Sequence, residues 1–194
     1  MLLNLESMLD TLISSKTRVK LLLKFFLNAN TKSYLRGLEG EFGESTNAIR
    51  LEVNRLEKAG MLSSFVEGNR KMFRANVKHP LFVEIHNILL KHVGIDQIIE
   101  KVIVGLGLVE KVYLVGDFAK GLDSKIIDLI FVGDIDKFFL LNLVEKAELL
   151  IHRKIRYIVL TSAELESADW NLYAAEPFLI WERETSSNKA KKTP

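Results

Sequence analysis

The chain has no cysteine among its 194 residues. Disulfide bonds and thiolate metal sites are therefore excluded, and a reducing compartment suits the protein. The chain also lacks an uninterrupted apolar run. Its most apolar stretch, residues 98–116, carries the charged pairs Glu100–Lys101 and Glu110–Lys111 before it is long enough to span a bilayer. No membrane span is predicted.

The first ten residues, MLLNLESMLD, lack the basic leading region of a signal peptide and carry Glu6 and Asp10. We therefore expect a cytoplasmic protein. A strong net charge is absent too, since the formal value is +2. The charges are segregated, however: residues 1–92 hold 14 Lys and Arg against 9 Asp and Glu, whereas residues 93–184 hold 10 against 16. A polyanionic partner is expected to bind the first half.

Apolar residues recur every three or four positions from residue 8 to 27, which predicts an amphipathic helix. A second helix is expected over SYLRGLEGEFG, ended by Gly43. A third is expected over ESTNAIRLEVNRLEKAG, with Ser45 or Thr46 as its N-cap and Gly60 at its end. The segments LSSFV and KMFRANV then read as two strands joined by the turn EGNR. Three helices followed by a hairpin form the winged-helix pattern.

A helix-turn-helix places its second helix, here the third of the chain, in the major groove of DNA. The start of that helix offers hydrogen-bonding side chains for base edges, and the hairpin tip offers others for phosphates or the minor groove. The predicted DNA-contacting residues are Ser45, Thr46, Asn47, Arg50 and Asn54 on the helix, and Asn69, Arg70 and Lys71 at the tip. Further candidates for the DNA backbone are Lys16, Arg18, Lys32 and Arg36. Three carboxylates oppose this interpretation if they face the duplex, namely Glu44, Glu52 and Glu67.

The segments SSKTRVKLLLKFFLN and SYLRGLEGEFGESTNAIRLEVNRLEKAGML resemble the winged-helix domains of bacterial transcription regulators of the arsenical-resistance-repressor type, over residues 8–78. The resemblance implies a homodimer on a palindromic site in double-stranded DNA. It does not carry over metal sensing, because the cysteine or clustered histidine and acidic ligands of those sensors are missing. A winged helix that docks proteins instead of DNA is the alternative.

The segment HPLFVEIHNILLKHVGID predicts a helix with a broad apolar stripe, suited to dimerisation or to packing between domains. Its histidines, His79, His86 and His92, do not share a helix face at ligand spacing, so no metal site is predicted.

The second half alternates between strand and helix patterns. Strands are expected in KVYLV, IIDLIFVG, IRYIVLT and EPFLIWER, with helices in IDQIIEKVIVGLG and DIDKFFLLNLVEKAELLIHR. The longer helix is expected to bury Phe138, Leu141, Val144, Leu149 and Ile151. The fold class is thus α+β, with a winged-helix DNA-binding domain at 1–78, a linker helix at 79–94, a mixed-sheet α/β domain at 95–184 and a disordered tail at 185–194.

The loop GDFAKGLDSK and the strand after it resemble the minimal nucleotidyltransferase family, over residues 95–162. The motif of that family is Gly-Ser, then Ala-x-Gly, then Ser-Asp-x-Asp on the next strand, and the residues that match it are Gly116, Ala119, Gly121 and Asp128. The resemblance implies that the serine contacts nucleotide phosphates and that two strand carboxylates hold two divalent cations.

Two departures from the motif fall on its chemistry. Asp117 stands in place of the serine, where its charge repels phosphate, and Ile126 stands in place of the first carboxylate, which removes a metal ligand. The predicted degenerate nucleotide site consists of Gly116, Asp117, Gly121 and Asp128, with no catalytic residue, metal or cofactor. A rearranged metal site of Asp117, Asp123 and Asp128 is a minor alternative.

The sequence therefore predicts a DNA-binding transcriptional regulator with a catalytically degenerate nucleotidyltransferase-like domain. That domain is expected to serve dimerisation or the sensing of a small-molecule ligand. Two alternatives stay open: an active nucleotidyltransferase and a winged-helix protein-docking module.

Overall fold

The computed structural model describes residues 9, 12–167 and 177–183. Contacts divide the chain into two units: Met1–Gln97 with Asp117–Lys125, and Ile98–Gly116 with Ile126–Pro194. The loop at 117–125, which follows a strand of the second unit, thus belongs to the first. The domain boundaries expected from the sequence describe parts of the chain that fold independently. Independent folding is not tested by these contacts, so the boundaries stay a prediction. The expected tail at 185–194 lies outside the described residues.

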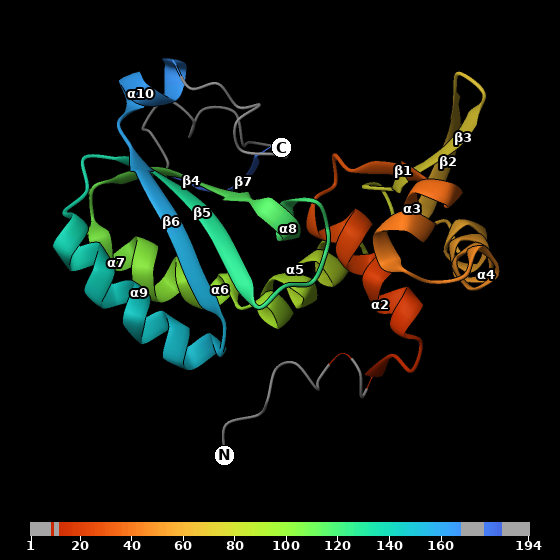
Figure 1. Ribbon diagram of the computed structural model, residues 1–194, viewed down its shortest axis with the longest axis horizontal. Coiled ribbons are helices and arrows are strands. Elements are labelled where there is room, and N and C mark those ends of the chain that lie inside the picture. The colour runs from red at the N-terminus through yellow and green to blue at the C-terminus, as the bar shows by residue number, and fades with distance from the viewer. Residues whose placement is uncertain (1–8, 10–11, 168–176, 184–194) are drawn as a thin grey trace. The chain divides into compact units, whose positions relative to one another are not determined.

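The first unit contains helices and a hairpin in the predicted order, but with different limits (Figure 1). The single helix expected over 8–27 is interrupted at residues 13–15, and residues 33–34, expected at the start of the second helix, belong to a strand. Its α2 begins at Lys16, because the Ser15 hydroxyl caps the helix by accepting a hydrogen bond from the backbone N of Arg18 at 3.3 Å. The elements in chain order are α2 (Lys16–Leu22), the π-helical turn η1 (Leu23–Leu27), β1 (Lys32–Tyr34), α3 (Leu35–Phe42), α4 (Thr46–Lys58), β2 (Leu62–Glu67), β3 (Arg70–Ala75), α5 (Phe82–Val93) and α6 (Ile95–Ile98).

A short turn joins α3 to α4. Gly43 ends α3 with a φ of +63°, a left-handed conformation that favours glycine. Ser45 is the N-cap of α4, since its hydroxyl accepts a hydrogen bond from the backbone N of Ala48 at 3.3 Å. Of the two predicted caps, Ser45 is therefore correct, and the hydroxyl of Thr46 instead donates to Glu39 of α3.

The strands of the first unit form an antiparallel sheet in the order β1-β3-β2. Helices α2, α3, α4 and α5 and the turn η1 supply the rest of its core. In Figure 1 the β2–β3 hairpin extends past α3 and α4 to an exposed tip at Gly68 and Asn69. The fully buried core residues include Leu21, Phe25, Phe26, Leu38, Ile49, Val53 and Phe73.

The second unit is built on a four-stranded sheet in the order β6-β5-β4-β7. The β5–β6 pair is parallel and the other pairs are antiparallel, so the predicted mixed sheet is confirmed. A parallel pair needs a crossover connection, which α9 supplies. The elements are η2 (Ile99–Ile103), α7 (Val104–Leu106), β4 (Val109–Val115), β5 (Ile126–Gly133), α9 (Lys137–Ile151), β6 (Lys154–Leu160), α10 (Ser162–Ser167) and β7 (Phe178–Glu182). The short helix α8 (Gly116–Ala119) follows β4, and all of it except Gly116 belongs to the first unit.

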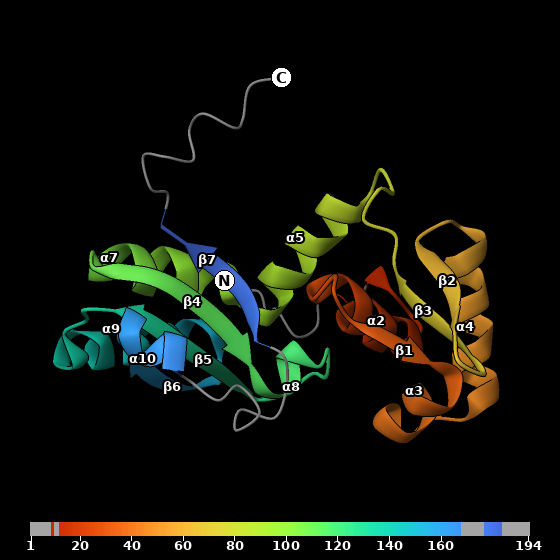
Figure 2. The ribbon, with the colours of Figure 1, turned by 90° about the horizontal axis from the view of Figure 1, so that it is seen from above.

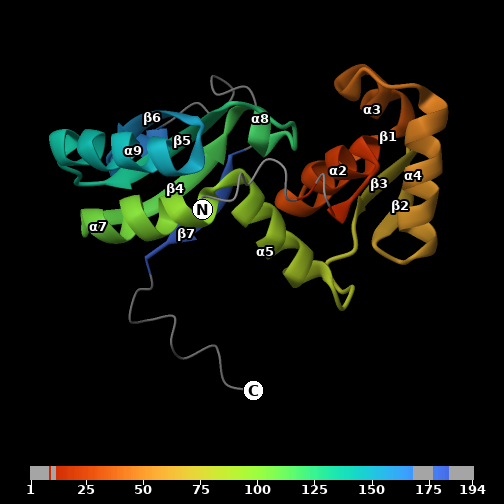
Figure 3. The ribbon, with the colours of Figure 1, turned by 90° about the horizontal axis from the view of Figure 1, so that it is seen from below.

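Alternation along β5 divides its side chains between the two faces of this sheet. Ile130 and Val132 form a buried cluster with Val115, against which Leu165 of α10 packs. The intervening residues of β5 point to the opposite face, along which α9 and α7 lie (Figure 3). Figure 2 shows α8 at the end of β4, where the chain leaves the sheet.

The α9 helix buries a different face from the predicted one. Its buried residues are Leu140, Val144, Ala147 and Ile151. The predictions for Phe138, Leu141 and Leu149 are wrong, because these side chains are 76%, 44% and 77% exposed. The segment FFLLNLVEKAELLI is apolar at most positions, so its periodicity does not select one face. The start of the helix is set locally, because Asp136 caps it by accepting hydrogen bonds from the backbone N of Phe138 and Phe139.

Glu44 at the α3–α4 turn makes the stability of the first unit depend on pH. A hydrogen bond from Lys20 Nζ (2.7 Å) and one from Thr17 hold the pKa of Glu44 below its usual value of 4.5. A depressed pKa stabilises the fold above the unfolded value, and this contribution is lost as the pH falls through the folded value. We expect Glu44→Gln to lower the free energy of unfolding at pH 7 by about 1 kcal/mol.

Thermal unfolding followed by circular dichroism between pH 7 and pH 3 measures this effect. The variant should lose less stability on acidification than the wild type, because it has no carboxylate to protonate at this position. The control is Glu84→Gln, which changes an exposed carboxylate on α5. An unchanged pH profile in Glu44→Gln contradicts the prediction.

Candidate functional site

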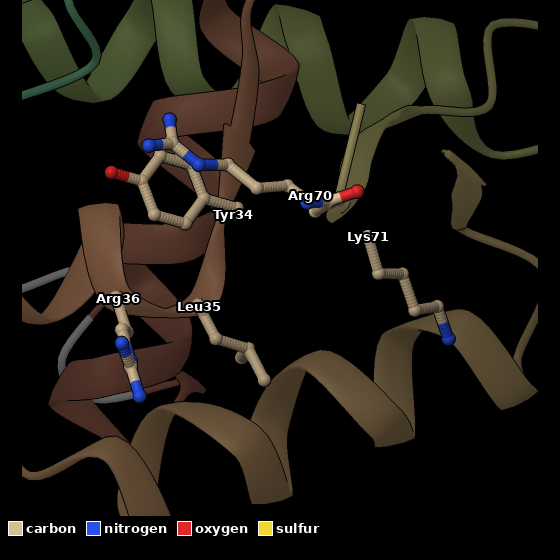
Figure 4. Close-up of a pocket in the computed structure, with 6 residues that line it drawn as sticks. Tyr34, Leu35, Arg36, Arg70 and Lys71 are labelled. Carbon is tan, nitrogen blue, oxygen red and sulfur yellow. The ribbon is translucent and has the colours of Figure 1, made fainter. Parts of the chain in front are cut away.

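A groove of about 610 Å³ lies between the start of α3 and the hairpin tip of the first unit (Figure 4). Three of its lining residues, Asn69, Arg70 and Lys71, were predicted to contact DNA, and Arg36 was a predicted backbone contact. The complete lining is Tyr34, Leu35, Arg36, Asn69, Arg70 and Lys71. The groove thus brings together cationic and amide side chains from two segments that are far apart in the sequence.

Arg70 is held in this groove by an aromatic ring. Its guanidinium carbon lies 4.5 Å from the centroid of the Tyr34 ring, and Figure 4 shows the guanidinium beside this ring. A guanidinium stacked in this way loses little of its hydrogen-bonding capacity, because its N–H donors lie at the edge of the plane. The Arg70 guanidinium therefore keeps N–H donors available for a hydrogen-bond acceptor.

Lys71 has a different role from its neighbour. Figure 4 shows its side chain directed towards a neighbouring helix, and its Nζ lies 2.9 Å from Glu57 Oε2 of α4. Hydrogen bonds from Ser64 and then from Lys71 lower the pKa of Glu57. Lys71, a predicted DNA-contacting residue, is therefore bonded within the protein, where its side chain joins the hairpin to α4.

The outward face of α4 carries three of the predicted base-reading residues. Asn47, Arg50 and Asn54 are all exposed, and their spacing of three and four residues places them on one face. In the part of the chain that the structure describes, none of these side chains has a hydrogen bond or ion pair. The other two predicted residues on α4, Ser45 and Thr46, are occupied at the helix start.

The three carboxylates that opposed DNA binding all have cationic partners. Glu52 is 4% exposed and accepts hydrogen bonds from Arg18 Nε and from Arg55 Nη1, both at 2.8 Å. Glu44 is paired with Lys20, and Glu67 is paired with Lys32 at 2.6 Å. These carboxylates are therefore neutralised locally and repel phosphate less than isolated ones would.

The residues predicted to contact the DNA backbone fall into two groups, those that form ion pairs within the protein and those that do not. Arg18 and Lys32 are committed to carboxylates. Lys16 and Arg36 are exposed, and neither has an ion pair within the described residues. Tyr34 is the residue that sequence reasoning missed, because it lies in the segment SYLRGLEGEFG, which was expected to be helical throughout. Its contact with Arg70 follows from strand pairing, which sets Tyr34 opposite Met72.

In the second unit, Asp128 has an arginine where a metal would be expected. Asp128 on β5 lies opposite Arg156 on β6 in the strand register. Arg156 Nε donates to Oδ1 at 2.6 Å and Nη2 donates to Oδ2 at 3.0 Å, which forms a bidentate pair. The negative charge of Asp128 is thus already balanced, and a cation at this carboxylate would have to displace the guanidinium.

The two glycines of the loop motif are required for close packing. Gly116 has a φ of +68°, and a Cβ there would lie 2.3 Å from Oδ2 of Asp128. Gly121 has a φ of +76°, and a Cβ there would lie 2.2 Å from the Cα of Lys24 on η1. Both glycines are explained by contacts with protein atoms. Asp117 between them is exposed.

Among the described residues, no group of three or more His, Asp and Glu side chains could hold a metal ion. Two of the histidines contact the backbone: His86 Nδ1 lies 2.8 Å from the carbonyl oxygen of Phe26, and His79 Nδ1 accepts a hydrogen bond from the backbone N of Leu81. Of the helices described, none has the length and apolar character needed to cross a membrane.

No protein-family model and no curated protein matches this chain. One solved structure, of a putative nucleotidyltransferase from Sulfolobus solfataricus, is 28% identical in sequence over 47% of this chain and 80% of its own, with a TM-score of 0.35. A TM-score of this size does not show a shared fold. The function therefore has to be inferred from the residues themselves.

The pairing of Asp128 with Arg156 predicts energetic coupling between them. Asp128→Ala and Arg156→Ala should each destabilise the protein, and the double variant should cost less than the sum of the two. Because Arg156 is largely exposed, we expect a coupling free energy of about 0.5–1 kcal/mol. Urea denaturation of the four proteins gives this value.

The exposed pair Glu100–Lys101, with its ions 3.9 Å apart, serves as the matched control. Its coupling should be near zero, because a wide, solvated pair gains little. Additive effects at Asp128 and Arg156 would show that the bidentate pair does not act as a unit.

Proposed function

We propose that the first unit is a winged helix-turn-helix that binds double-stranded DNA, and that the protein is a transcriptional regulator. The observation that carries this proposal is the exposed face of α4, where Asn47, Arg50 and Asn54 have no partner within the described residues. Polar side chains at the start of a recognition helix are the groups that read base edges in the major groove.

Each of these side chains has a distinct expected role. Arg50 has the geometry to donate two hydrogen bonds to a guanine, and Asn47 and Asn54 have the geometry to pair with an adenine. The groove at the hairpin tip would hold a backbone phosphate between Arg36 and the stacked Arg70. Phosphate contacts of this kind fix the register of the protein on DNA, whereas the α4 contacts give sequence specificity.

The paired carboxylates support DNA binding over protein docking. Glu44, Glu52 and Glu67 would each repel DNA if left unpaired, and each is matched by a cation of the same unit. The cations that remain without ion pairs in the described residues include Arg36 and Arg50. The balance of charge at this face therefore favours a polyanion.

We further propose that the second unit resembles a nucleotidyltransferase without its transfer chemistry. Transfer of a nucleotide uses two metal ions held by carboxylates on one strand face. Ile126 shares the face of Asp128 but offers no ligand atom, and Asp128 is held by Arg156. This unit would then serve dimerisation or the sensing of a small-molecule ligand.

DNA binding is tested by selecting genomic fragments that the purified protein retains, followed by titration at several salt concentrations. We expect Arg50→Ala to weaken binding to the selected site by about 10- to 100-fold and to relax the preference at one base. Arg70→Ala should weaken binding to all sequences alike and reduce the salt slope by about one, because it removes a phosphate contact.

Lys91→Ala is the control, because Lys91 is an exposed cation on α5 outside both predicted contact regions. It should leave affinity and salt slope nearly unchanged. The regulator proposal fails if no fragment is retained in a salt-dependent manner, or if Arg50→Ala and Arg70→Ala behave like the control. Retention of one stoichiometric protein without DNA would favour the docking alternative.

Loss of nucleotidyl transfer is tested by incubating the protein with labelled nucleoside triphosphates and Mg²⁺ or Mn²⁺. We expect no labelled product above the level of the Asp128→Ala variant, since the site lacks a second carboxylate ligand. Labelling that depends on Asp128 would show that the enzyme is active and would overturn this part of the proposal.

A further inference from the structure

The outer face of α9 in the second unit is unusually apolar for a surface helix. Phe138 and Leu149 are 76% and 77% exposed, although each lies on a well-formed helix. Phe139, Leu141 and Leu150 on the flanks are also exposed. Single exposed apolar residues are common, but several on one helix mark an interaction surface.

The residues opposite the buried face follow a regular spacing. The centre of the exposed face carries Phe138, Asn142, Glu145 and Leu149, at intervals of four, three and four residues. Intervals of this kind place side chains along one seam, as in a two-helix coiled coil. The seam is apolar at both ends and polar in the middle.

This order of residues complements itself when a second copy runs antiparallel. With the two-fold axis midway along the seam, Phe138 faces Leu149 of the second copy, and Asn142 faces Glu145 of the second copy. Each amide can then donate to a carboxylate, twice by symmetry. A parallel pair would set Glu145 against Glu145 and place like charges in contact.

Charges at the helix ends favour the same direction. Lys137 at the start of α9 would lie near the C-terminal end of the second copy, where the helix dipole is negative. In an antiparallel pair the two helix dipoles also oppose each other. The apolar, polar and charged residues of α9 therefore all favour the antiparallel pairing of two copies of this helix.

We propose that α9 is a homodimer interface, along which a second copy of this chain packs in an antiparallel, two-fold arrangement. The inference deepens the proposed function, because it assigns dimerisation to a surface of the second unit. It does not depend on DNA binding, since the contacts are made by α9 alone.

Exposed apolar residues are also found in α7 and directly after it. Val104 of α7 and Leu108 after it are 68% and 58% exposed. The intervening Gly105 lies against α9, because a Cβ at this glycine would be 3.3 Å from the side chain of Leu143. Helix α7 thus packs beside α9 within the same unit and carries exposed apolar residues of its own.

Helix α5, which the sequence suggested as a dimerisation helix, offers a poorer surface. Its exposed apolar residues Val83 and Ile88 are accompanied by the exposed polar residues Glu84, Asn87 and Lys91. The seam of α9 has two large apolar side chains at matched distances from its centre, and α5 has no such pair. Burial of apolar side chains is the main source of helix association in water.

The test measures molar mass by sedimentation equilibrium, without DNA. We expect the wild-type protein to dimerise at micromolar concentrations. Phe138→Glu and Leu149→Lys should each raise the dissociation constant at least about tenfold, because each sets a charge against an apolar side chain of the other copy.

The double variant Phe138→Glu with Leu149→Lys distinguishes the antiparallel arrangement from others. The introduced carboxylate of one copy then faces the introduced ammonium of the other, and dimerisation should return towards the wild-type value. Pairing within one chain is excluded, because eleven residues of helix separate the two positions by about 16 Å. A parallel pair would face like charges and show no recovery.

The control is Val83→Glu, which places the same charge on an exposed apolar position of α5. It should leave the dissociation constant unchanged. Thermal melts of all variants verify folding, and we expect small shifts because the changed side chains are exposed. A monomeric wild type at about 100 μM, or dimerisation insensitive to both single variants, overturns the proposal. Association with a different protein by a monomeric wild type overturns it as well.

DNA binding of the same proteins separates this inference from the proposed function. If the wild type dimerises through α9 but retains no DNA, the regulator proposal fails and the interface stands. If Phe138→Glu and the wild type are both monomeric and bind DNA equally, the interface fails and the regulator proposal stands.

Discussion

The buried carboxylate of Glu52 determines how the first unit presents α4. Glu52 accepts hydrogen bonds from Arg18 of α2 and from Arg55 of α4, so it ties the inner side of α4 to α2. Burial raises the pKa of Glu52, but the hydrogen bond from Arg18 and the surrounding positive charge outweigh it and keep the pKa below its usual value. Removing one partner of a buried ion pair is costly, because the other charge is left without compensation. With its inner side fixed, α4 has one face left for a partner.

Ion pairs also decide which cations of the first unit are available. Arg18, Lys20 and Lys32 form ion pairs with carboxylates of the same unit. Left unpaired, these carboxylates would repel a polyanion. Arg70 is oriented by the ring of Tyr34, and Arg50 projects from α4. The basic half of the chain is thus divided into cations that hold the fold and cations that face outward. Net charge alone does not make this division, since it counts both kinds equally.

The glycines of the loop after β4 have a second explanation besides nucleotide binding. Gly116 and Gly121 fit a nucleotide-binding motif, yet each lies against a protein atom that a Cβ would strike. Asp128 fits the motif as a metal ligand, yet its carboxylate is bound by a guanidinium on the next strand. A motif reports which residue types are present, whereas the chemistry depends on what those residues touch.

The short elements β1, α8 and α10 were not expected from the sequence. The sequence by itself determined the helix limits at Gly43 and Ser45, the hairpin, and the strands of the mixed sheet. Caps, left-handed glycines and alternation act over a few residues, so local sequence encodes them. It did not determine the buried face of α9, the partners of Lys71 and Glu52, or the stacking of Arg70 on Tyr34. Those depend on segments far apart in the chain, and tertiary structure decided them, because packing and ion pairing are properties of surfaces that exist after folding.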